Sequence, residues 1–262
     1  MLVSRLRSVF ARGILLACAA LLFVSCSTLD VAKVKKTEHA AVPIITVDEY
    51  IDLSEVGGAA TLAQRLAEDE EFDLSPMVDK LQQRVYNGYA GQLPVTVMSE
   101  ESVIDADQYQ KFSLLDNRAY DDRYENLSAL LVPDGYKKYR LGKGALIGSR
   151  QKKMFGAVPD RADALMFASA SYALIEDNPF WYFFVPFGAD RGYVEATVRL
   201  EMIDRSGDTI LRISESRTSD RYVNVVKGFT ANAEKIQPMC VNATEKAFAA
   251  VDQFIQEELS GS

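Results

Sequence analysis

Side chains suited to nucleophilic or metal chemistry are scarce in this chain of 262 residues, which holds three cysteines and one histidine. The cysteines are Cys18, Cys26 and Cys240, and the histidine is His39. A Ser-His-Asp or Cys-His arrangement would have to use His39, which lies in a polar stretch near the N-terminus. A site for a metal bound by histidine and cysteine lacks enough ligands. We therefore expect no catalytic residue, no metal and no cofactor, so that the protein would not be an enzyme.

Cys26 follows a leader of the kind that directs proteins to export. Arg5, Arg7 and Arg12 make the leader basic, and residues 13–24 form an uninterrupted run of apolar or small residues. A run of about a dozen residues is too short for a membrane-spanning helix, which needs roughly 20. We therefore interpret residues 1–25 as a cleaved signal peptide in preference to a permanent transmembrane anchor.

The end of this leader, Leu22-Phe23-Val24-Ser25-Cys26, resembles the lipobox of bacterial lipoproteins. In that motif a signal peptidase cuts before the cysteine, whose thiol carries diacylglycerol. Phe23 departs from the usual leucine, and Cys18 is a second candidate that would leave a much shorter apolar run. The resemblance implies lipid attachment at Cys26. Ser27 stands where an aspartate would favour the inner membrane, which implies an outer-membrane protein that faces the periplasm.

The body of the chain is acidic. The formal charge of the whole chain is −8, and the signal peptide removes three arginines from the mature protein. An acidic surface repels nucleic acid on average, so we expect no nucleic-acid partner. Residues 26–41 are polar and without clear periodicity, which predicts a flexible tether between the lipid and a single domain over residues 42–259.

The first half of this domain has the pattern of a βαβ unit. Residues 42–53 are rich in β-branched residues and read as a strand with Pro43 at its edge. Ser75 and Pro76 then suit the start of a helix with one apolar face, and residues 94–99 alternate as a second strand. Residues 102–115 could form another short helix. A helix between two strands favours parallel pairing of those strands.

The second half has the pattern of an antiparallel hairpin with a closing helix. Residues 162–175 read as a buried strand, and residues 193–203 and 209–216 alternate cleanly on either side of a turn. From Asn232 onward the apolar residues, Cys240 among them, are spaced to place one helix face on the sheet. We therefore predict the α/β (α+β) class, with a single mixed sheet and helices packed on it.

A cluster of aromatic residues stands between the buried strand and the hairpin. Residues 178–188 read NPFWYFFVPFG. Such a segment can pack on the core, enter a lipid interface or fill a groove on a partner. The candidate contact residues for a partner or a membrane are Phe180, Trp181, Tyr182, Phe183 and Phe184.

The order of these elements resembles the group of periplasmic lipoprotein domains typified by CsgG and LpoB. The hairpin around Val198–Asp204 and Ser206–Leu211 is similar to that of the group, and so is Ala162-Asp163-Ala164-Leu165 at the start of a strand. The first strand lacks the A-V-L-P-F sequence motif that is usual in the group. The resemblance implies an assembly factor, a secretion-channel subunit or an activator of wall synthesis, with no shared catalytic residues.

Two functions follow as expectations, and a third stays open. The first is a noncatalytic envelope lipoprotein that is anchored in the membrane through its lipid and binds another envelope protein. The alternative is a pore-forming or membrane-inserting subunit of a secretion channel, for which oligomerisation is possible. The third is an enzyme that uses carboxylates alone, with Asp48, Glu49 and Asp52 as candidates.

Overall fold

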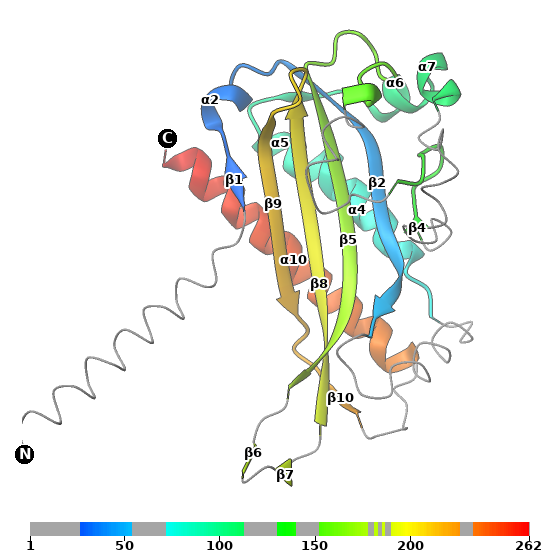
Figure 1. Ribbon diagram of the computed structural model, residues 1–262, viewed down its shortest axis with the longest axis vertical. Coiled ribbons are helices and arrows are strands. Elements are labelled where there is room, and N and C mark those ends of the chain that lie inside the picture. Colours follow the sequence, from blue (N-terminus) through cyan, green and yellow to red (C-terminus); the bar gives the residue numbers. More distant parts are fainter. Residues whose placement is uncertain are drawn as a thin grey trace, which may run out of the picture.

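One mixed β-sheet organises the molecule (Figure 1). The structure is a computed structural model that describes residues 27–53, 72–112, 130–139, 152–177, 181–182, 185–186, 190–225 and 233–261. Within these residues eight strands form the sheet, in the order β1-β9-β8-β5-β2-β3, with β10 on β8 and β4 on β2. The strands are β1 (Thr28–Leu29), β2 (His39–Asp52), β3 (Thr96–Val97), β4 (Leu130–Leu131), β5 (Ala164–Asp177), β8 (Asp190–Asp204), β9 (Thr209–Thr218) and β10 (Val223–Val225).

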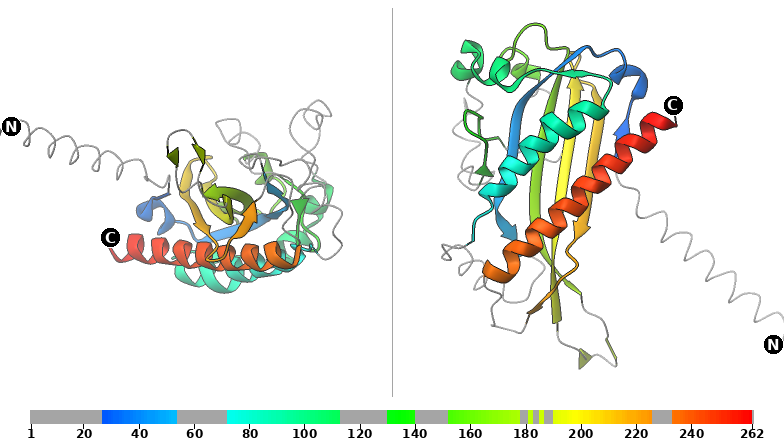
Figure 2. Two further views of the ribbon diagram at one scale, coloured as in Figure 1. Left: turned by 90° about the horizontal axis from the view of Figure 1, so that it is seen from below. Right: turned by 180° about the vertical axis from the view of Figure 1, so that it is seen from behind.

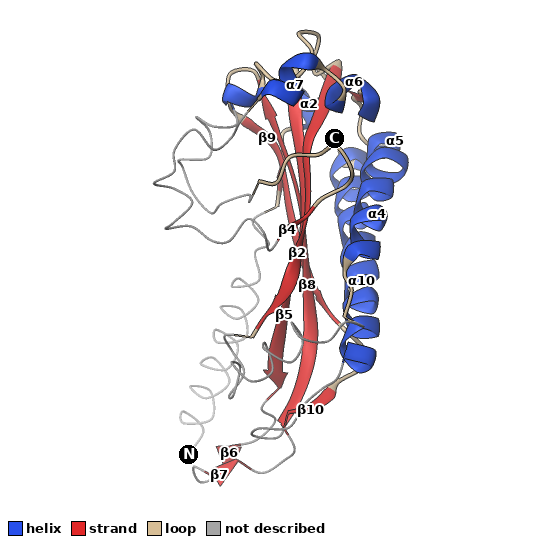
Figure 3. Ribbon diagram, turned by 90° about the vertical axis from the view of Figure 1, so that its right-hand side faces the viewer, coloured by secondary structure: helices blue, strands red, loops and turns tan. Residues whose placement is uncertain are grey.

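The long helices lie on one face of this sheet (Figures 2 and 3). One helical stretch consists of α4 (Ser75–Gln83), a π-helical segment η1 (Arg84–Tyr89) and α5 (Ala90–Gln92). The other is α10 (Ala233–Ser260), which runs diagonally across β8 and β9. Two short helices, α6 (Glu100–Ile104) and α7 (Asp107–Lys111), lie at one end of the sheet beside β2.

The predicted α/β class and both predicted units are confirmed. The parallel pairing of β2 with β3, with α4 between them in sequence, is the βαβ unit. β8 and β9 pair from Ile203 and Thr209 to Glu195 and Thr218, which is the antiparallel hairpin. The closing helix α10 packs on that hairpin. Cys240 is fully buried there, and burial raises the pKa of its thiol to about 12, as expected of an unreactive core cysteine.

Pro43 lies inside β2 and not at its edge, which differs from the expectation. A proline has no N–H to donate to a neighbouring strand, so a central strand tolerates it only where the pairing is interrupted. The register between β2 and β5 shifts between Ala41 and Ile44, and the shift accommodates Pro43. The buried hydroxyl of Tyr109 donates to the Pro43 carbonyl at 2.7 Å, and burial raises the pKa of Tyr109 to about 12.

One other boundary also differs from expectation. The helix predicted over residues 102–115 is two separate short helices in the described part of the chain, α6 and α7, with Asp105 and Ala106 between them.

The helix that starts at Ser75 continues without a break to Gln92, because η1 includes Gly88 and joins α4 to α5. Arg84 of η1 reaches α10, where its Nη1 lies 3.1 Å from Asp252 Oδ2.

The predicted flexible tether over residues 26–41 is wrong for the part that the structure describes. Residues 28–29 form β1, Val31–Val34 form the helix α2, and β2 begins at His39. Val34 has no exposed surface, and Ala40 and Ala41 are equally buried. The domain therefore includes the described residues ahead of residue 42, and at its other end α10 extends to Ser260.

No helix among the described residues is long and apolar enough to cross a membrane.

Candidate attachment site and contact surfaces

The predicted site residues fall at two places in the structure. Cys26 lies outside the described residues, but it immediately precedes Ser27, where the description begins. Trp181 and Tyr182 form the short strand β6 (Trp181–Tyr182). Phe180, Phe183 and Phe184 lie outside the described residues, as do residues 1–25. The two places are the N-terminal end of the domain and the turn between β5 and β8.

The N-terminal end is fastened to the edge of the sheet. β1 pairs with β9, with Thr28 opposite Arg212 and Leu29 opposite Leu211. Ahead of β1, the Ser27 hydroxyl accepts a hydrogen bond from the Ser214 backbone N–H at 3.1 Å. Behind it, the Asp30 N–H donates to the Ile210 carbonyl at 2.9 Å. The chain is thus held to β9 from its first described residue.

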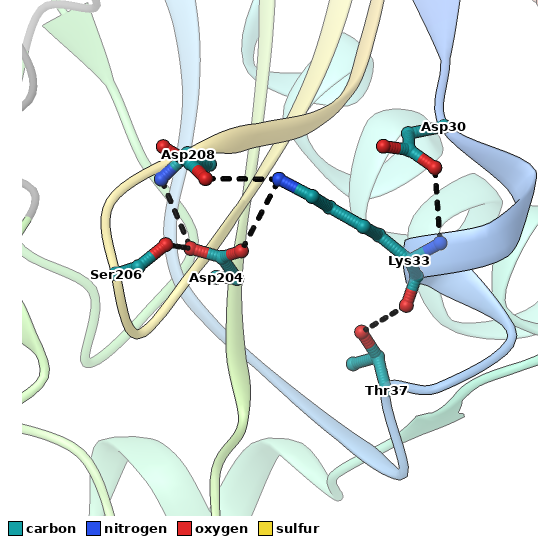
Figure 4. Close-up of polar contacts among 6 residues, drawn as sticks. All are labelled: Asp30, Lys33, Thr37, Asp204, Ser206 and Asp208. Atoms are coloured by element: carbon teal, nitrogen blue, oxygen red, sulfur yellow. Dashed lines mark hydrogen bonds and ion pairs between the residues drawn. The ribbon is translucent and has the colours of Figure 1, made fainter.

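A polar cluster then fastens α2 to the turn between β8 and β9 (Figure 4). Asp30 caps α2 by accepting from the Lys33 N–H at 3.0 Å. The Lys33 ammonium donates to Asp208 Oδ2 at 2.9 Å and lies 4.0 Å from Asp204 Oδ2. At the far end of α2, the Thr37 hydroxyl donates to the Lys33 carbonyl at 3.1 Å. Lys33 therefore joins the N-terminal segment to residues far along the sequence, and we call this set the Lys33 cluster.

The turn that Lys33 contacts is itself well ordered by hydrogen bonds. Asp204 Oδ1 accepts from the Asp208 N–H at 2.9 Å and from the Ser206 hydroxyl. Gly207 has a φ of 84°, a left-handed conformation that favours glycine, and its N–H donates to the Asp204 carbonyl at 2.9 Å. The turn thereby presents two carboxylates, Asp204 and Asp208, toward Lys33.

The charges of the Lys33 cluster perturb each other. The hydrogen bond from Lys33 holds the pKa of Asp208 below its ordinary value of 3.8. The same hydrogen bond raises the pKa of Lys33 above 10.5. Because both groups are exposed to solvent, we read the cluster as a positional link and not as a large source of stability.

The sheet face away from α10 carries a row of hydroxyl groups around one arginine. Ser169, Arg199 and Ser214 stand opposite one another on β5, β8 and β9. The next row on the same face is Ser171, Thr197 and Ser216, and the Thr197 and Ser216 hydroxyls are 2.7 Å apart. We call these six residues the polar sheet face.

Arg199 is the most unusual residue of the polar sheet face. Its side chain is half-buried, yet it makes no hydrogen bond or ion pair with the described residues. The nearest carboxylate on the same strand and face, Glu201, is already paired with Arg212 at 2.8 Å. A guanidinium with free donors among hydroxyl groups suits a polar or anionic partner. The alternation of polar and apolar residues along the strands predicts that this face is polar. The sequence does not show which residues stand opposite Arg199, because that depends on the register between the strands.

The described parts of the aromatic segment, Trp181–Tyr182 and Val185–Pro186, lie in sequence between the two strands of the longest hairpin in the described structure. β5 and β8 pair from Ala164 and Asp204 to Asp177 and Arg191. Beyond that point, β6 pairs with β7 (Val185–Pro186), with Trp181 opposite Pro186. β6 and β7 lie past the end of the main sheet (Figure 1). β6 and β7 therefore form a separate two-stranded sheet and are not strands of the main sheet.

A further cluster, which was not predicted from the sequence, surrounds the single histidine. Parallel pairing of Ala40 with Ala164 brings His39 and Glu38 beside Asp163. One possible ligand atom from each residue lies within 4.8 Å of the others. Asp163 Oδ2, however, already accepts the backbone N–H groups of Glu38 and His39 at 3.2 and 3.1 Å. The carboxylate thus has a structural role at the start of β2, so we assign no metal to it.

A small apolar hollow lies beneath α7. Its empty volume is about 170 Å³, below the 300–1,000 Å³ that is typical of ligand sites. The residues that line it include Pro43, Tyr109, Phe112 and Met154. The candidate carboxylates Asp48, Glu49 and Asp52 are elsewhere, on the last part of β2. This hollow is therefore no candidate for a substrate pocket.

Comparisons with known proteins show no family for this chain. No protein-family model and no curated protein matches the chain. Among solved structures, the chain is similar to a neuraminyllactose-binding hemagglutinin homolog from Helicobacter pylori, with a TM-score of 0.33, 10% identity, and coverage of 86% of this chain and 84% of that chain. It is also similar to the hypothetical protein CT253 from Chlamydia trachomatis, with a TM-score of 0.28, 8% identity, and coverage of 84% and 98%. Likenesses at this level support no statement about family or function, and the resemblance to the CsgG and LpoB group stays a prediction.

Proposed function

We propose that the protein is a noncatalytic bacterial envelope lipoprotein, acylated at Cys26, whose periplasmic domain binds another envelope component. One observation carries the proposal: the apolar run of the leader ends two residues before Cys26, in a segment that resembles a lipobox, and the described chain is held to the sheet from Ser27 onward. A cysteine at the junction between an export leader and a folded domain is placed where a lipid can be attached and the domain retained outside the cytoplasm.

Two surfaces are proposed to meet the partner. The first is the aromatic turn that contains Trp181 and Tyr182, beyond the end of the sheet. Aromatic side chains with polar tips are suited to interfaces because they combine apolar area with hydrogen bonding. The second is the polar sheet face, where Arg199 forms no hydrogen bond or ion pair with the described residues. Arginine and aromatic residues are the types that most often dominate binding energy at protein interfaces.

A double substitution at the aromatic turn tests this proposal. Replacing Trp181 and Phe183 by serine is expected to reduce crosslinking to the envelope partner at least tenfold, while the thermal unfolding transition stays cooperative. The matched control is Tyr50→Ser, because Tyr50 is an aromatic residue of β2 with 49% of its surface exposed. Loss of the cooperative transition in the double variant would show that these rings belong to the core. Turnover of wall, lipid or sugar substrates by the purified protein would contradict the noncatalytic role.

A pore-forming or membrane-inserting subunit is the second candidate function. The observation that favours it is the length of the β5–β8 hairpin, because its strands of 14 and 15 residues exceed the 9–11 residues that a membrane-spanning strand needs. The aromatic turn would then lead the hairpin into the bilayer. Leakage of dye from liposomes together with ring-shaped oligomers would favour this function, and a monomer inert toward vesicles would count against it.

A further inference from the structure

The second half of β9 is an edge of the main sheet. β1 covers only the first part of β9, up to the pair of Thr28 with Arg212. Among the described residues no other strand pairs with β9 on that side, so the stretch from Ser214 to Thr218 has no strand beside it. An uncovered edge presents backbone N–H and C=O groups to which another chain can add a strand.

The register of β9 shows which backbone groups face outward at this edge. Along an antiparallel strand, successive residues direct their backbone groups alternately toward one neighbour and toward the other. Just past the strand, the Ser219 N–H donates to a carbonyl of β8 at 2.8 Å. Counting back from there, the residues that face outward are Ser214, Ser216 and Thr218. The Ser214 N–H agrees with this assignment, because it donates to the Ser27 hydroxyl on the outer side.

Two cationic side chains occupy the outward carbonyls farther along this edge. The Arg217 guanidinium donates to the Ser216 carbonyl at 2.8 Å. The Lys246 ammonium, which comes from α10, donates to the Thr218 carbonyl at 2.7 Å. Each of the three outward-facing residues therefore already has one backbone group bonded within the chain.

Carboxylates hold both cations in place. Arg217 Nη1 also lies 2.9 Å from Glu215 Oε2, and Glu215 is only 8% exposed. Lys246 Nζ also donates to Asp220 Oδ1 at 2.9 Å, and this hydrogen bond is the largest cause that holds the pKa of Asp220 below its ordinary value of 3.8. Moving Arg217 away from the edge would leave a buried carboxylate unpaired, which is costly.

We propose that Arg217 and Lys246 close the edge of β9 against strand addition by a second copy of this chain. An added strand would have to donate its N–H groups to the Ser216 and Thr218 carbonyls, which the two cations occupy. A second copy would also bring its own two cations to the same edge, and like charges at close range repel each other. Lysines and other charged side chains at exposed strands are a general protection against such pairing.

A second copy is the strand donor that this edge must exclude, because it is always present at the concentration of the protein itself. Its β9 also matches in register. In an antiparallel pair centred on Ser216, Ser214 of one copy would stand opposite Thr218 of the other, and the outward groups of both strands would face each other. The inference does not depend on acylation of Cys26, so it stands or falls separately from the proposed function.

Removing the two cations, together with the carboxylate that Arg217 pairs with, tests the proposal. The triple variant Glu215→Val, Arg217→Thr and Lys246→Met frees the carbonyls of the edge and leaves no buried carboxylate unpaired. The full chain is purified in dodecyl maltoside micelles, and its dimer fraction is measured by sedimentation velocity. At equal protein concentration, the dimer fraction of the variant is expected to be at least about fivefold that of the wild type. An equal dimer fraction would overturn the proposal.

A proline at the centre of the edge is the matched control. Ser216→Pro in the triple variant removes an outward N–H that a second strand needs, and an edge strand tolerates proline at such a position. The dimer fraction is expected to return to that of the wild type, and a dimer that persists would overturn the proposal. If the triple variant has no cooperative thermal transition, Lys246→Met alone decides. Its dimer fraction is expected to be at least about twofold that of the wild type, and no increase would overturn the proposal.

Discussion

At the scale of single residues, Lys33 determines how the N-terminal segment is held. Its ammonium group bridges α2 and the turn between β8 and β9 through Asp208 and Asp204. Asp208 has a lowered pKa, so its favourable contribution is complete above pH 3.8 and is lost as the pH falls through the lowered value. Lys33 has a raised pKa, so its contribution is complete below pH 10.5 and is lost as the pH rises through the raised value. The link is therefore complete from about pH 4 to about pH 10.

Removing the charge of Lys33 should change both the pKa of Asp208 and the hydrogen exchange of the N-terminal segment. In Lys33→Met, we expect the pKa of Asp208 to rise toward 3.8, because the hydrogen bond from Lys33 is the largest cause of its depression. We also expect faster hydrogen exchange at the Asp30 amide, which bonds to Ile210, with amides of α10 unchanged. NMR titration and native-state exchange measure the two effects. Lys35→Met is the matched control, since that exposed lysine has no ion pair with the described residues. An unaltered Asp208 titration in Lys33→Met would show that the ion pair does not form in solution.

The environment of a single residue could be predicted from the sequence only where its side-chain chemistry or its place in a periodic pattern indicated it. Cys240 was predicted to be a buried helix residue from its spacing, and the structure confirms it. The partnership of Lys33 with Asp208 was not predictable, because it depends on how two distant segments meet. The contact of His39 with Asp163 was missed for the same reason, since it arises from parallel pairing between β2 and β5.

At the scale of elements, a buried polar contact joins α10 to the sheet within an apolar interface. The Thr244 hydroxyl donates its hydrogen to the Cys240 carbonyl at 2.7 Å. Because a hydroxyl has only one hydrogen, the contact of 3.0 Å between Thr244 and Tyr172 requires Tyr172 of β5 to donate. Both side chains are almost completely buried. Thr244 thus satisfies the buried phenol of Tyr172 and joins helix to strand.

This arrangement predicts unequal costs for removing its two partners. Thr244→Val leaves the Tyr172 hydroxyl buried without an acceptor and should lower the free energy of unfolding by about 1–3 kcal/mol. Tyr172→Phe leaves Thr244 bonded to Cys240 and should cost only about 1 kcal/mol. Unfolding by urea, monitored by circular dichroism, measures both values, and the double variant reports their coupling. A larger cost for Tyr172→Phe than for Thr244→Val would contradict the assigned donor and acceptor.

Helices and strands could be predicted from the sequence where they are long enough to show a periodic pattern of apolar residues, as in the β8–β9 hairpin and α10. The expected tether was wrong because β1 and α2 have only two and four residues, too few to show a period. Both are stabilised by contacts with β9 and with the turn before it, which lie far along the chain. Pro43 likewise sits within a strand only because a register shift and Tyr109 accommodate it.

At the scale of the whole molecule, the proposed lipid anchor and the folded domain adjoin each other in the sequence. Ser27, directly after the proposed lipid-bearing residue, and the strand β1 that follows it are hydrogen-bonded to β9 near one edge of the sheet. The aromatic turn lies at the end of the long hairpin, distant from this edge along the strands. Acylation of Cys26 would therefore hold the domain at a membrane.

The most direct measurement is mass spectrometry of the N-terminal peptide of the mature protein, isolated from the membranes of a bacterium that expresses the full chain. We predict that the chain begins at Cys26 and that its sulfur carries a diacylglycerol thioether. A chain that keeps residues 1–25, or a mature chain whose Cys26 thiol is unmodified, would contradict the account.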